Sequence, residues 1–183
     1  LVAYAKANPG KLNYATSGNG TIVHLNSAAF SAQAGIEMTH VPYKGTALAI
    51  PDMVSGQVQV LFDSLPTGMP HVKSGRLKAL AVTSEKRSAL APELPTVAES
   101  GMPGYSSVTW FGLYLPAGAS PALVERINKA FTKALQSPEL AASLAKLGVE
   151  PAATSTPAQF GAMVQADSNR WATVIRDRKI SIE

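Results

Sequence analysis

The sequence predicts an α/β fold, because strand-like and helix-like segments alternate along its first 80 residues. Apolar strands are expected at residues 11–15, 58–62 and 77–83, and a further β-like stretch at residues 37–41 is closed by Pro42. The strands are separated by turns and by segments with apolar residues near helical spacing. This alternation favours a parallel sheet with helices on its faces.

The helices of this first part are delimited by glycine and proline. Four helices are expected, at residues 1–8, 21–34, 46–55 and 67–73. Gly35 is a typical C-terminal stop for the second helix. Pro51 lies inside the third helix, which we therefore expect to start late or to be irregular.

The pattern changes after Thr83. Residues 84–104 are rich in Pro, Ser, Gly and Glu, and we expect a long connection there with one helical turn at residues 96–100. Residues 107–115 (SVTWFGLYL) combine β-branched and aromatic side chains, which favours a strand. A further short strand is expected at residues 149–151.

Three helices close the chain, and each begins with a hydroxyl residue followed by proline. The pairs are Ser120-Pro121, Ser137-Pro138 and Thr156-Pro157, and the last helix is expected to end near Lys179. A single main strand offers too little sheet surface for three helices to pack against. We therefore expect a complete α/β domain at residues 1–104 and an incomplete second lobe at residues 105–183.

Composition excludes several classes of protein. Of the 183 residues 46% are apolar and 15% charged, as in a globular chain, and the net charge of +4 is spread without a run of five like charges. A nucleic-acid partner is therefore not expected. The absence of cysteine excludes disulfides and thiol chemistry. We read the start at Leu1 rather than Met as internal to a longer sequence.

The loop Ser17-Gly18-Asn19-Gly20-Thr21 is the leading candidate for a binding site. It follows a strand and opens a helix, where first-turn amides lack partners and the helix dipole favours an anion. We expect Ser17, Thr21 and the amides from Gly18 to Thr21 to hold a carboxylate. The alternative is an ordinary turn that serves chain geometry, with Thr21 as the helix cap.

Two phosphate-binding motifs are excluded for this loop. The third glycine of a dinucleotide fingerprint would fall at Val23, and no lysine follows the glycines as a Walker A motif requires. No cofactor is predicted.

Other candidate ligand contacts are His24, Tyr43, Lys44, Gly45 and Asp63. His24 lies one turn into the helix and either faces the ligand or is a partly buried imidazole bonded to a backbone carbonyl. Tyr43, Lys44 and Gly45 form a second turn at a strand end, where open α/β sheets place ligands; Lys44 could equally be a solvated lysine. Asp63 ends the central strand and either accepts from a ligand hydroxyl or ammonium group or caps the next helix.

The remaining histidines and aromatics carry weaker signals. His40 and His71 have no partner at metal-ligand spacing, so no metal site is predicted. Trp110 and Phe111 either flank a cleft or serve as hinge or core aromatics.

Five segments in register resemble the Bug family, the periplasmic solute receptors of tripartite tricarboxylate transporters. They are LVAYAKANPGKLNYATSGNGTIVHL, VPYKG, SGQVQVLFDSLPTGMPHVKSGRLKALAVTS, APELPTVAESGMPGY and TWFGLYLPAG with SPALVERINKAF. Thr46 departs from the family pattern, which tends to have glycine there.

The resemblance implies a two-lobed receptor of the type II periplasmic-binding-protein class, without catalysis. By that comparison residues 1–104 are the ligand-binding second lobe, and residues 105–183 are the C-terminal part of the first lobe. The expected partners are a small organic acid or amino acid and the membrane subunits of a transporter, and the expected location is the periplasm.

Two other interpretations stay open at this stage. One is a hydrolase using Ser17 and His24, although the chain has no G-x-S-x-G motif and no evident carboxylate to orient the histidine. The other is a binding-deficient chain that self-associates through its incomplete lobe, because unpaired edges and uncovered apolar faces favour association.

Overall fold

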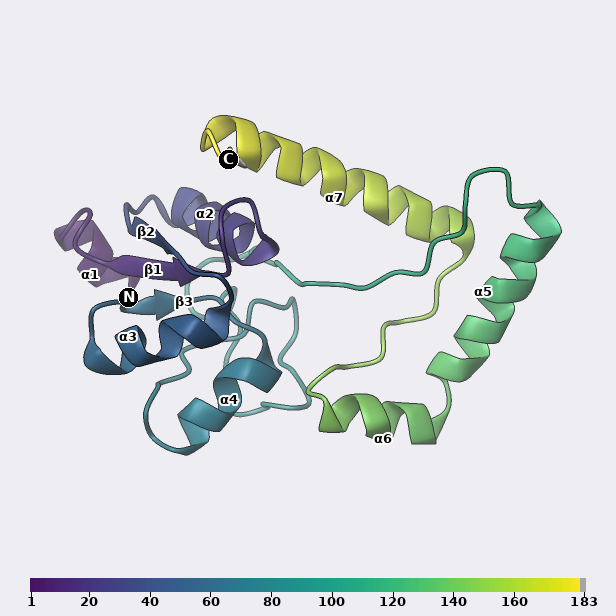
Figure 1. The fold of residues 1–183 in the computed structure, drawn as a ribbon, viewed down its shortest axis with the longest axis horizontal. Helices are drawn as coiled ribbons and strands as arrows, with labels where there is room; N and C mark the ends of the chain where they lie inside the picture. The colour runs from purple at the N-terminus through teal and green to yellow at the C-terminus, as the bar shows by residue number, and fades with distance from the viewer. Residues whose placement is uncertain (182–183) are drawn as a thin grey trace. The chain divides into compact units, whose positions relative to one another are not determined.

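The computed structural model describes residues 1–181, which divide into two compact units (Figure 1). The first unit comprises Leu1–Val108 and the chain from Trp171 onward. The second comprises Thr109–Arg170. No helix in the described part of the chain is both long and apolar enough to cross a membrane.

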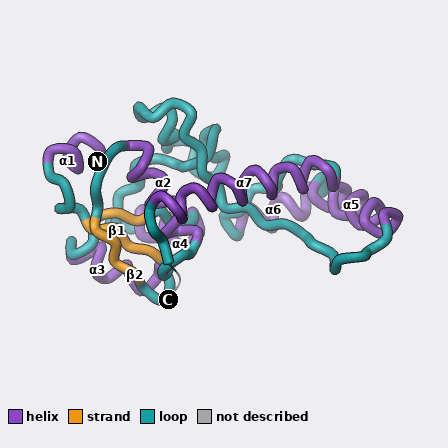
Figure 2. Tube along the Cα trace, turned by 90° about the horizontal axis from the view of Figure 1, so that it is seen from above, coloured by secondary structure: helices purple, strands orange, loops and turns teal. Residues whose placement is uncertain are grey.

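A three-stranded parallel sheet lies at the centre of the first unit. The strands are β1 (Asn13–Thr16), β2 (Thr39–Pro42) and β3 (Val60–Leu61), in the order β2-β1-β3, and Figure 2 shows them side by side. Tyr14 of β1 is level with His40 of β2 and with Val60 of β3. The predicted parallel α/β arrangement is confirmed.

The helices of this unit begin and end close to the predicted positions. They are α1 (Val2–Ala7), α2 (Ile22–Ala34), the 3₁₀ helix η1 (Thr46–Ala49), α3 (Ile50–Ser55) and α4 (Leu65–Lys73). Gly35 ends α2 in the left-handed region, with φ of 60°. The predicted irregularity around Pro51 is also confirmed, since the segment divides into η1 and α3 and Pro51 lies in the first turn of α3.

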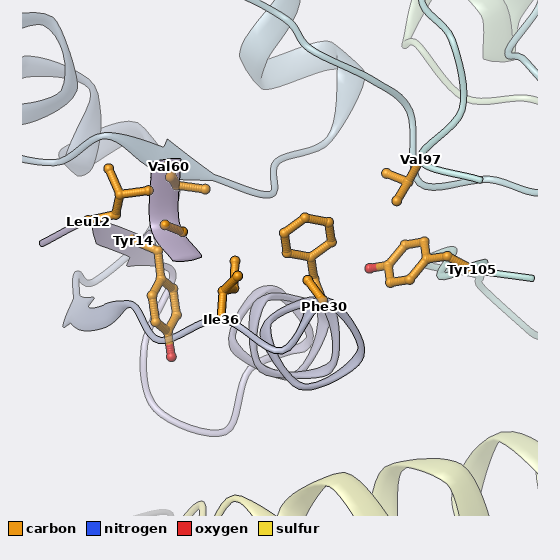
Figure 3. Close-up of a cluster of buried hydrophobic side chains, with 9 residues drawn as sticks. Leu12, Tyr14, Phe30, Ile36, Val60, Val97 and Tyr105 are labelled. Carbon is orange, nitrogen blue, oxygen red and sulfur yellow. The ribbon is translucent and has the colours of Figure 1, made fainter. Parts of the chain in front are cut away.

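The two faces of the sheet carry separate apolar clusters. Tyr14 points into a cluster with Phe30 of α2, whereas Ala15 points to the opposite face and packs with Ala49 of η1. Figure 1 shows α2 and α3 on opposite sides of the sheet. In Figure 3 the ring of Phe30 faces Val97 and Tyr105, so the long connection contributes to the core.

The prediction of a strand at residues 77–83 is wrong. Its one ladder contact is an isolated parallel bridge between Val82 and Thr96, in which the amide of Val82 donates to Pro95 O at 2.9 Å. The other residues of this segment form no ladder with β3. The strand predicted at residues 58–62 is likewise reduced to Val60–Leu61.

The prediction of a strand at residues 107–115 is also wrong. The amide of Ser107 donates to Thr83 O at 2.8 Å, but residues 108–115 make no backbone hydrogen bond with any described residue. Strand propensity cannot form a ladder without a partner strand. For the same reason the short strand predicted at residues 149–151 is absent from the structure.

The second unit is formed by helices and irregular chain. It holds α5 (Pro121–Leu135), α6 (Pro138–Lys146) and most of α7 (Pro157–Asp177). Ser120 and Ser137 cap α5 and α6 by accepting from the amides of Leu123 and Leu140, as predicted. No residue between Thr109 and Arg170, a range described throughout, is buried.

Candidate functional site

The carboxyl ends of the three strands meet at one edge of the sheet. Thr16 is level with Pro42 of β2, and Ala15 is level with Leu61, the last residue of β3, which lies two residues before Asp63. The amide of Tyr43 donates to Thr16 O at 3.1 Å. The structure therefore brings together the Ser17–Thr21 loop and Tyr43, as the sequence predicted, and places Asp63 just beyond the end of the neighbouring strand β3.

Glycine is required in this loop by its backbone. Gly18 has φ of 130° and Gly20 has φ of 70°, values that side chains disfavour. A Cβ added at Gly18 would lie 3.6 Å from Tyr43 O. The two turns are thus in direct contact.

Most of the loop amides already have acceptors, unlike the expectation that all four would face an anion. The amide of Gly18 donates to Thr16 Oγ1 at 3.2 Å, that of Gly20 to His24 Nδ1 at 3.2 Å, and that of Thr21 to Gly18 O at 3.4 Å. The amides of Ser17 and Asn19 have no acceptor among residues 1–181, and neither has the half-buried hydroxyl of Ser17. These are the donors left for a ligand.

Thr21 serves as the helix cap, the structural role considered for it. Its hydroxyl donates to Gly18 O at 2.8 Å and accepts from the amide of His24 at 3.4 Å. This capping fixes the loop against the first turn of α2, whose dipole favours negative charge at that end.

His24 lies within an aromatic cluster that the sequence did not reveal. Its ring stacks on His40 with centroids 3.9 Å apart, and His40 stacks on Tyr14 at 5.0 Å. His40 Nε2 is 2.7 Å from Thr16 Oγ1. The signal that could have found the cluster is strand register, because Tyr14 and Thr16 share a face of β1 and His40 is level with Tyr14.

Burial disfavours charge in this cluster. It lowers the pKa of His24, and together with the charge of neighbouring His24 it lowers the pKa of His40 to about 4. Burial also raises the pKa of the Tyr14 hydroxyl, an effect that Arg178 partly opposes. Among residues 1–181 the His24 ring bonds to no backbone carbonyl, and it does not bond to Ser17 as a Ser–His hydrolase would need.

Tyr43 and Lys44 differ in how they are held. The hydroxyl of Tyr43 donates to Asp52 Oδ2 at 2.6 Å, and this bond raises the pKa of Tyr43 to about 12. Its phenol is therefore engaged by α3. Lys44 is exposed, and Gly45 has φ of 125°, which allows the chain to turn into η1.

Asp63 carries a buried oxygen without a partner. Its Oδ1 accepts from the amide of Ser64 at 2.9 Å, whereas Oδ2 is buried and has no hydrogen-bond partner among the described residues. Burial raises the pKa of Asp63, and the Ser64 amide and Thr46 hydroxyl oppose that rise. The N-cap position of α4 is Ser64, without a side-chain cap bond.

The side chains of Trp110 and Phe111 lie in the second unit. Trp110 Nε1 donates to Asp167 at 2.9 Å and its ring packs edge-on against Phe160 in the second unit, while Phe111 is 86% exposed. Among residues 1–181 no group of three His, Asp or Glu side chains is placed to hold a metal ion. A cavity of about 420 Å³ near Tyr14 and His24 is lined by none of the residues of the Ser17–Thr21 loop.

The sequence matches a known receptor family over almost its whole length. The profile described as "Tripartite tricarboxylate transporter family receptor" matches residues 1–180. The UPF0065 protein in the tcbD-tcbE intergenic region of Pseudomonas sp. strain P51 is 36% identical over 182 residues, which are 99% of this chain and 54% of that protein. Protein BugT of Bordetella pertussis is 33% identical over 177 residues, 97% of this chain and 54% of BugT.

Solved structures agree with this match. Rpa4515 of R. palustris, solved with adipate, has a TM-score of 0.81 and 34% identity, covering 98% of this chain and 60% of its own. MatC (Rpa3494) of Rhodopseudomonas palustris, solved with bound malate, has a TM-score of 0.72 and 27% identity, covering 95% and 60%. The chain thus spans about half the length of these curated relatives, and the fold prediction of a periplasmic-binding-protein class with one lobe incomplete is confirmed.

Proposed function

The chain belongs to the tripartite tricarboxylate transporter receptor family, and we propose that it is the carboxylate-binding part of a periplasmic solute receptor. It binds a small carboxylate reversibly, without catalysis, and the whole receptor presents the ligand to membrane subunits of a transporter. Adipate and malate, the ligands of the two solved relatives, are both dicarboxylates, which supports this ligand class.

The observation that carries the proposal is the set of unpaired donors at the start of α2. Beside this helix N-terminus, the amides of Ser17 and Asn19 and the hydroxyl of Ser17 have no acceptor in the described part of the chain. No acidic side chain lies in the first turn of α2 to compete with an incoming anion. A carboxylate oxygen placed there would gain charge-assisted hydrogen bonds without requiring a paired cation.

The neighbouring residues would complete the site. In this proposal the glycines allow the backbone turn of the loop, and Thr21 caps α2. The backbone of Tyr43 forms one side of the site, and Lys44 supplies a cation near it. The proposed site comprises Ser17, Gly18, Asn19, Gly20, Thr21, His24, Tyr43, Lys44, Gly45 and Asp63.

Asp63 would add selectivity for ligands that carry a hydrogen-bond donor. Its unpartnered Oδ2 could accept from a ligand hydroxyl or ammonium group. Malate offers such a hydroxyl and adipate does not. Asp63→Asn should therefore weaken malate binding more than adipate binding.

Calorimetric titration with malate and adipate tests the proposal. We expect saturable binding without turnover, and a loss of affinity of about tenfold or more in the double variant Ser17→Ala, Thr21→Ala. The Ser17 change would remove a hydrogen bond to a charged group, which contributes about 1.5–3 kcal/mol, and the Thr21 change would remove the cap that fixes the loop. The matched control is Ser120→Ala, Thr156→Ala, which removes two helix-capping hydroxyls in the second unit.

The outcomes separate the competing interpretations. An unchanged affinity for both acids in the Ser17→Ala, Thr21→Ala variant would show that the loop is not part of the ligand site. Turnover of an ester probe would favour the hydrolase. A chain that elutes as a dimer and binds neither acid would favour self-association through the second unit.

A further inference from the structure

We infer that His24 is a positioning residue, whose neutral imidazole holds the Ser17–Thr21 loop in its anion-binding shape and releases it on protonation. The inference rests on the proposed function for its effect on ligand affinity. Its structural part, the link between His24 and Gly20, concerns this chain alone.

The first step is the bond between the loop and its own helix. The amide of Gly20 donates to His24 Nδ1 at 3.2 Å. A ring nitrogen accepts a hydrogen bond only when it carries no proton, so in this arrangement the neutral ring has its proton on Nε2. Protonation of the ring would place two N–H groups face to face and break the bond.

The second step is how the ring of His24 is held in place. It stacks on His40 at 3.9 Å with an interplanar angle of 23°. His40 Nε2 in turn lies 2.7 Å from Thr16 Oγ1, which accepts from the amide of Gly18 at 3.2 Å. A chain of contacts therefore runs from Gly18 through Thr16, His40 and His24 and returns to the loop at Gly20.

This chain of contacts holds the residues on both sides of one proposed ligand donor, the amide of Asn19. Gly18 and Gly20 are the two residues that flank Asn19, whose amide has no acceptor among the described residues. Fixing both neighbours fixes the direction of the Asn19 amide. Loss of the bond at Gly20 would let this amide rotate, which lowers affinity by loss of preorganisation rather than by loss of a direct contact.

The charges around His24 do not favour its protonation. His40 on β2 and Tyr14 on β1 face it as rings, and Arg178 and Glu37 line the same cavity. Glu37 forms no ion pair with His24, and Arg178 is a cation that would oppose a second positive charge nearby. Burial lowers the pKa of His24, so the loop is held at neutral pH and released only in acid.

A direct contact between charged His24 and a carboxylate predicts the opposite behaviour. An imidazolium that paired with the ligand would make binding tighter as the pH falls. A positioning role predicts weaker binding. Malate and adipate also take up protons in acid. The affinities of wild type and variant are therefore compared at the same pH, where protonation of the ligand affects both equally.

The test uses His24→Asn and His24→Ala. Asparagine places an uncharged acceptor, Oδ1, near the position of Nδ1, whereas alanine removes it. The Gly20 amide is followed by NMR and hydrogen exchange between pH 4 and 8 without ligand. We expect the chemical shift of the Gly20 amide to follow the His24 titration in the wild type and to stay constant in His24→Asn. At neutral pH its exchange rate should rise about tenfold in His24→Ala but not in His24→Asn, as expected from loss of a hydrogen bond of about 1.4 kcal/mol.

Binding of malate and adipate is then compared across the same pH range. We expect the affinity ratio of wild type to His24→Asn to fall several-fold toward pH 4. A Gly20 amide that ignores the His24 titration, or a ratio that rises in acid, would overturn the inference. If the wild type binds neither acid, the proposed function fails, and the Gly20 measurements still decide whether His24 holds the loop.

Discussion

Two aromatic side chains of the same kind meet opposite environments in the two units. Phe30 on α2 is 4% exposed and packs with Val97 and Tyr105, whereas Phe131 on α5 is 46% exposed. Both helices have a hydroxyl N-cap, and α5 has the more strongly segregated apolar face. Helix formation is therefore local in both units, but only the first has a sheet against which its helices bury apolar surface.

The same contrast explains the extended segments. β1 is a strand because β2 and β3 pair with it on both sides. Residues 108–115 have stronger strand propensity and remain unpaired, with Phe111 and Tyr114 exposed. A helix satisfies its own backbone, whereas a strand depends on another segment.

The largest expected difference between the units comes from truncating these two phenylalanines. Phe30→Ala should destabilise the first unit by about 3–5 kcal/mol, since it leaves a cavity in the core. Phe131→Ala should cost less than about 1 kcal/mol, because the side chain is half exposed. Urea unfolding followed by circular dichroism measures both. An equal cost would mean that the apolar face of α5 is covered in solution, which size-exclusion chromatography would then reveal as association.

A smaller difference is expected from the helix caps. Thr21→Ala should cost about 1–2 kcal/mol, because the hydroxyl both caps α2 and bonds to Gly18 O. Ser120→Ala should lower the helicity of α5 while changing the unfolding free energy of the first unit by less than about 0.5 kcal/mol. If Ser120→Ala destabilised the first unit as much as Thr21→Ala does, the two units would not unfold independently.

The stacked histidines should make the stability of the first unit depend on pH. The pKa of His40 is about 4 in the folded state and about 6.5 when unfolded, so between these values the unfolded chain binds more protons. Stability is therefore complete above pH 6.5, falls as the pH drops toward 4, and changes no further below it from this group. Allowing for solvent near the ring, we expect a loss of about 1 kcal/mol.

Thermal unfolding at closely spaced pH values measures this loss. His40→Gln should reduce the loss of stability between pH 6.5 and 4, leaving the part that comes from His24, and His71→Gln, at a residue outside the stacked cluster, should leave the profile intact. A wild-type profile that is flat in this window would contradict the buried, neutral state of His40.

The smallest effect is expected at Tyr43. Tyr43→Phe removes a hydrogen bond to Asp52 at a partly exposed position, and should cost about 0.5–1 kcal/mol. Malate affinity should stay within about threefold, because the phenol is turned toward α3. A tenfold loss measured by calorimetry would show instead that the hydroxyl leaves Asp52 to contact the ligand.

The candidate site could be predicted in part. Turn chemistry located the Ser17–Thr21 loop, and strand order placed Tyr43 and Asp63 beside it. The stacking of His24 on His40 was not predicted, because it depends on strand register and on side-chain direction across 16 residues of sequence. The bond from Gly20 to His24 spans only four residues but depends on the direction of the imidazole ring. Direct ligand contact by the ten proposed residues stays a prediction.

Local sequence alone determined the helices, their caps, the parallel α/β class of the first part and the family. Each of these depends on interactions within a few residues, such as Ser120 with Leu123, or on motifs read directly from the chain. Tertiary structure decided which apolar stretches became strands and which loop donors remained free. Strand pairing requires a segment distant in sequence: β1 pairs with β2 and β3, whereas residues 108–115 have no such partner among residues 1–181. The loop amides of Gly18 and Gly20 are bonded within four residues, but only the folded conformation of the loop brings their acceptors within reach.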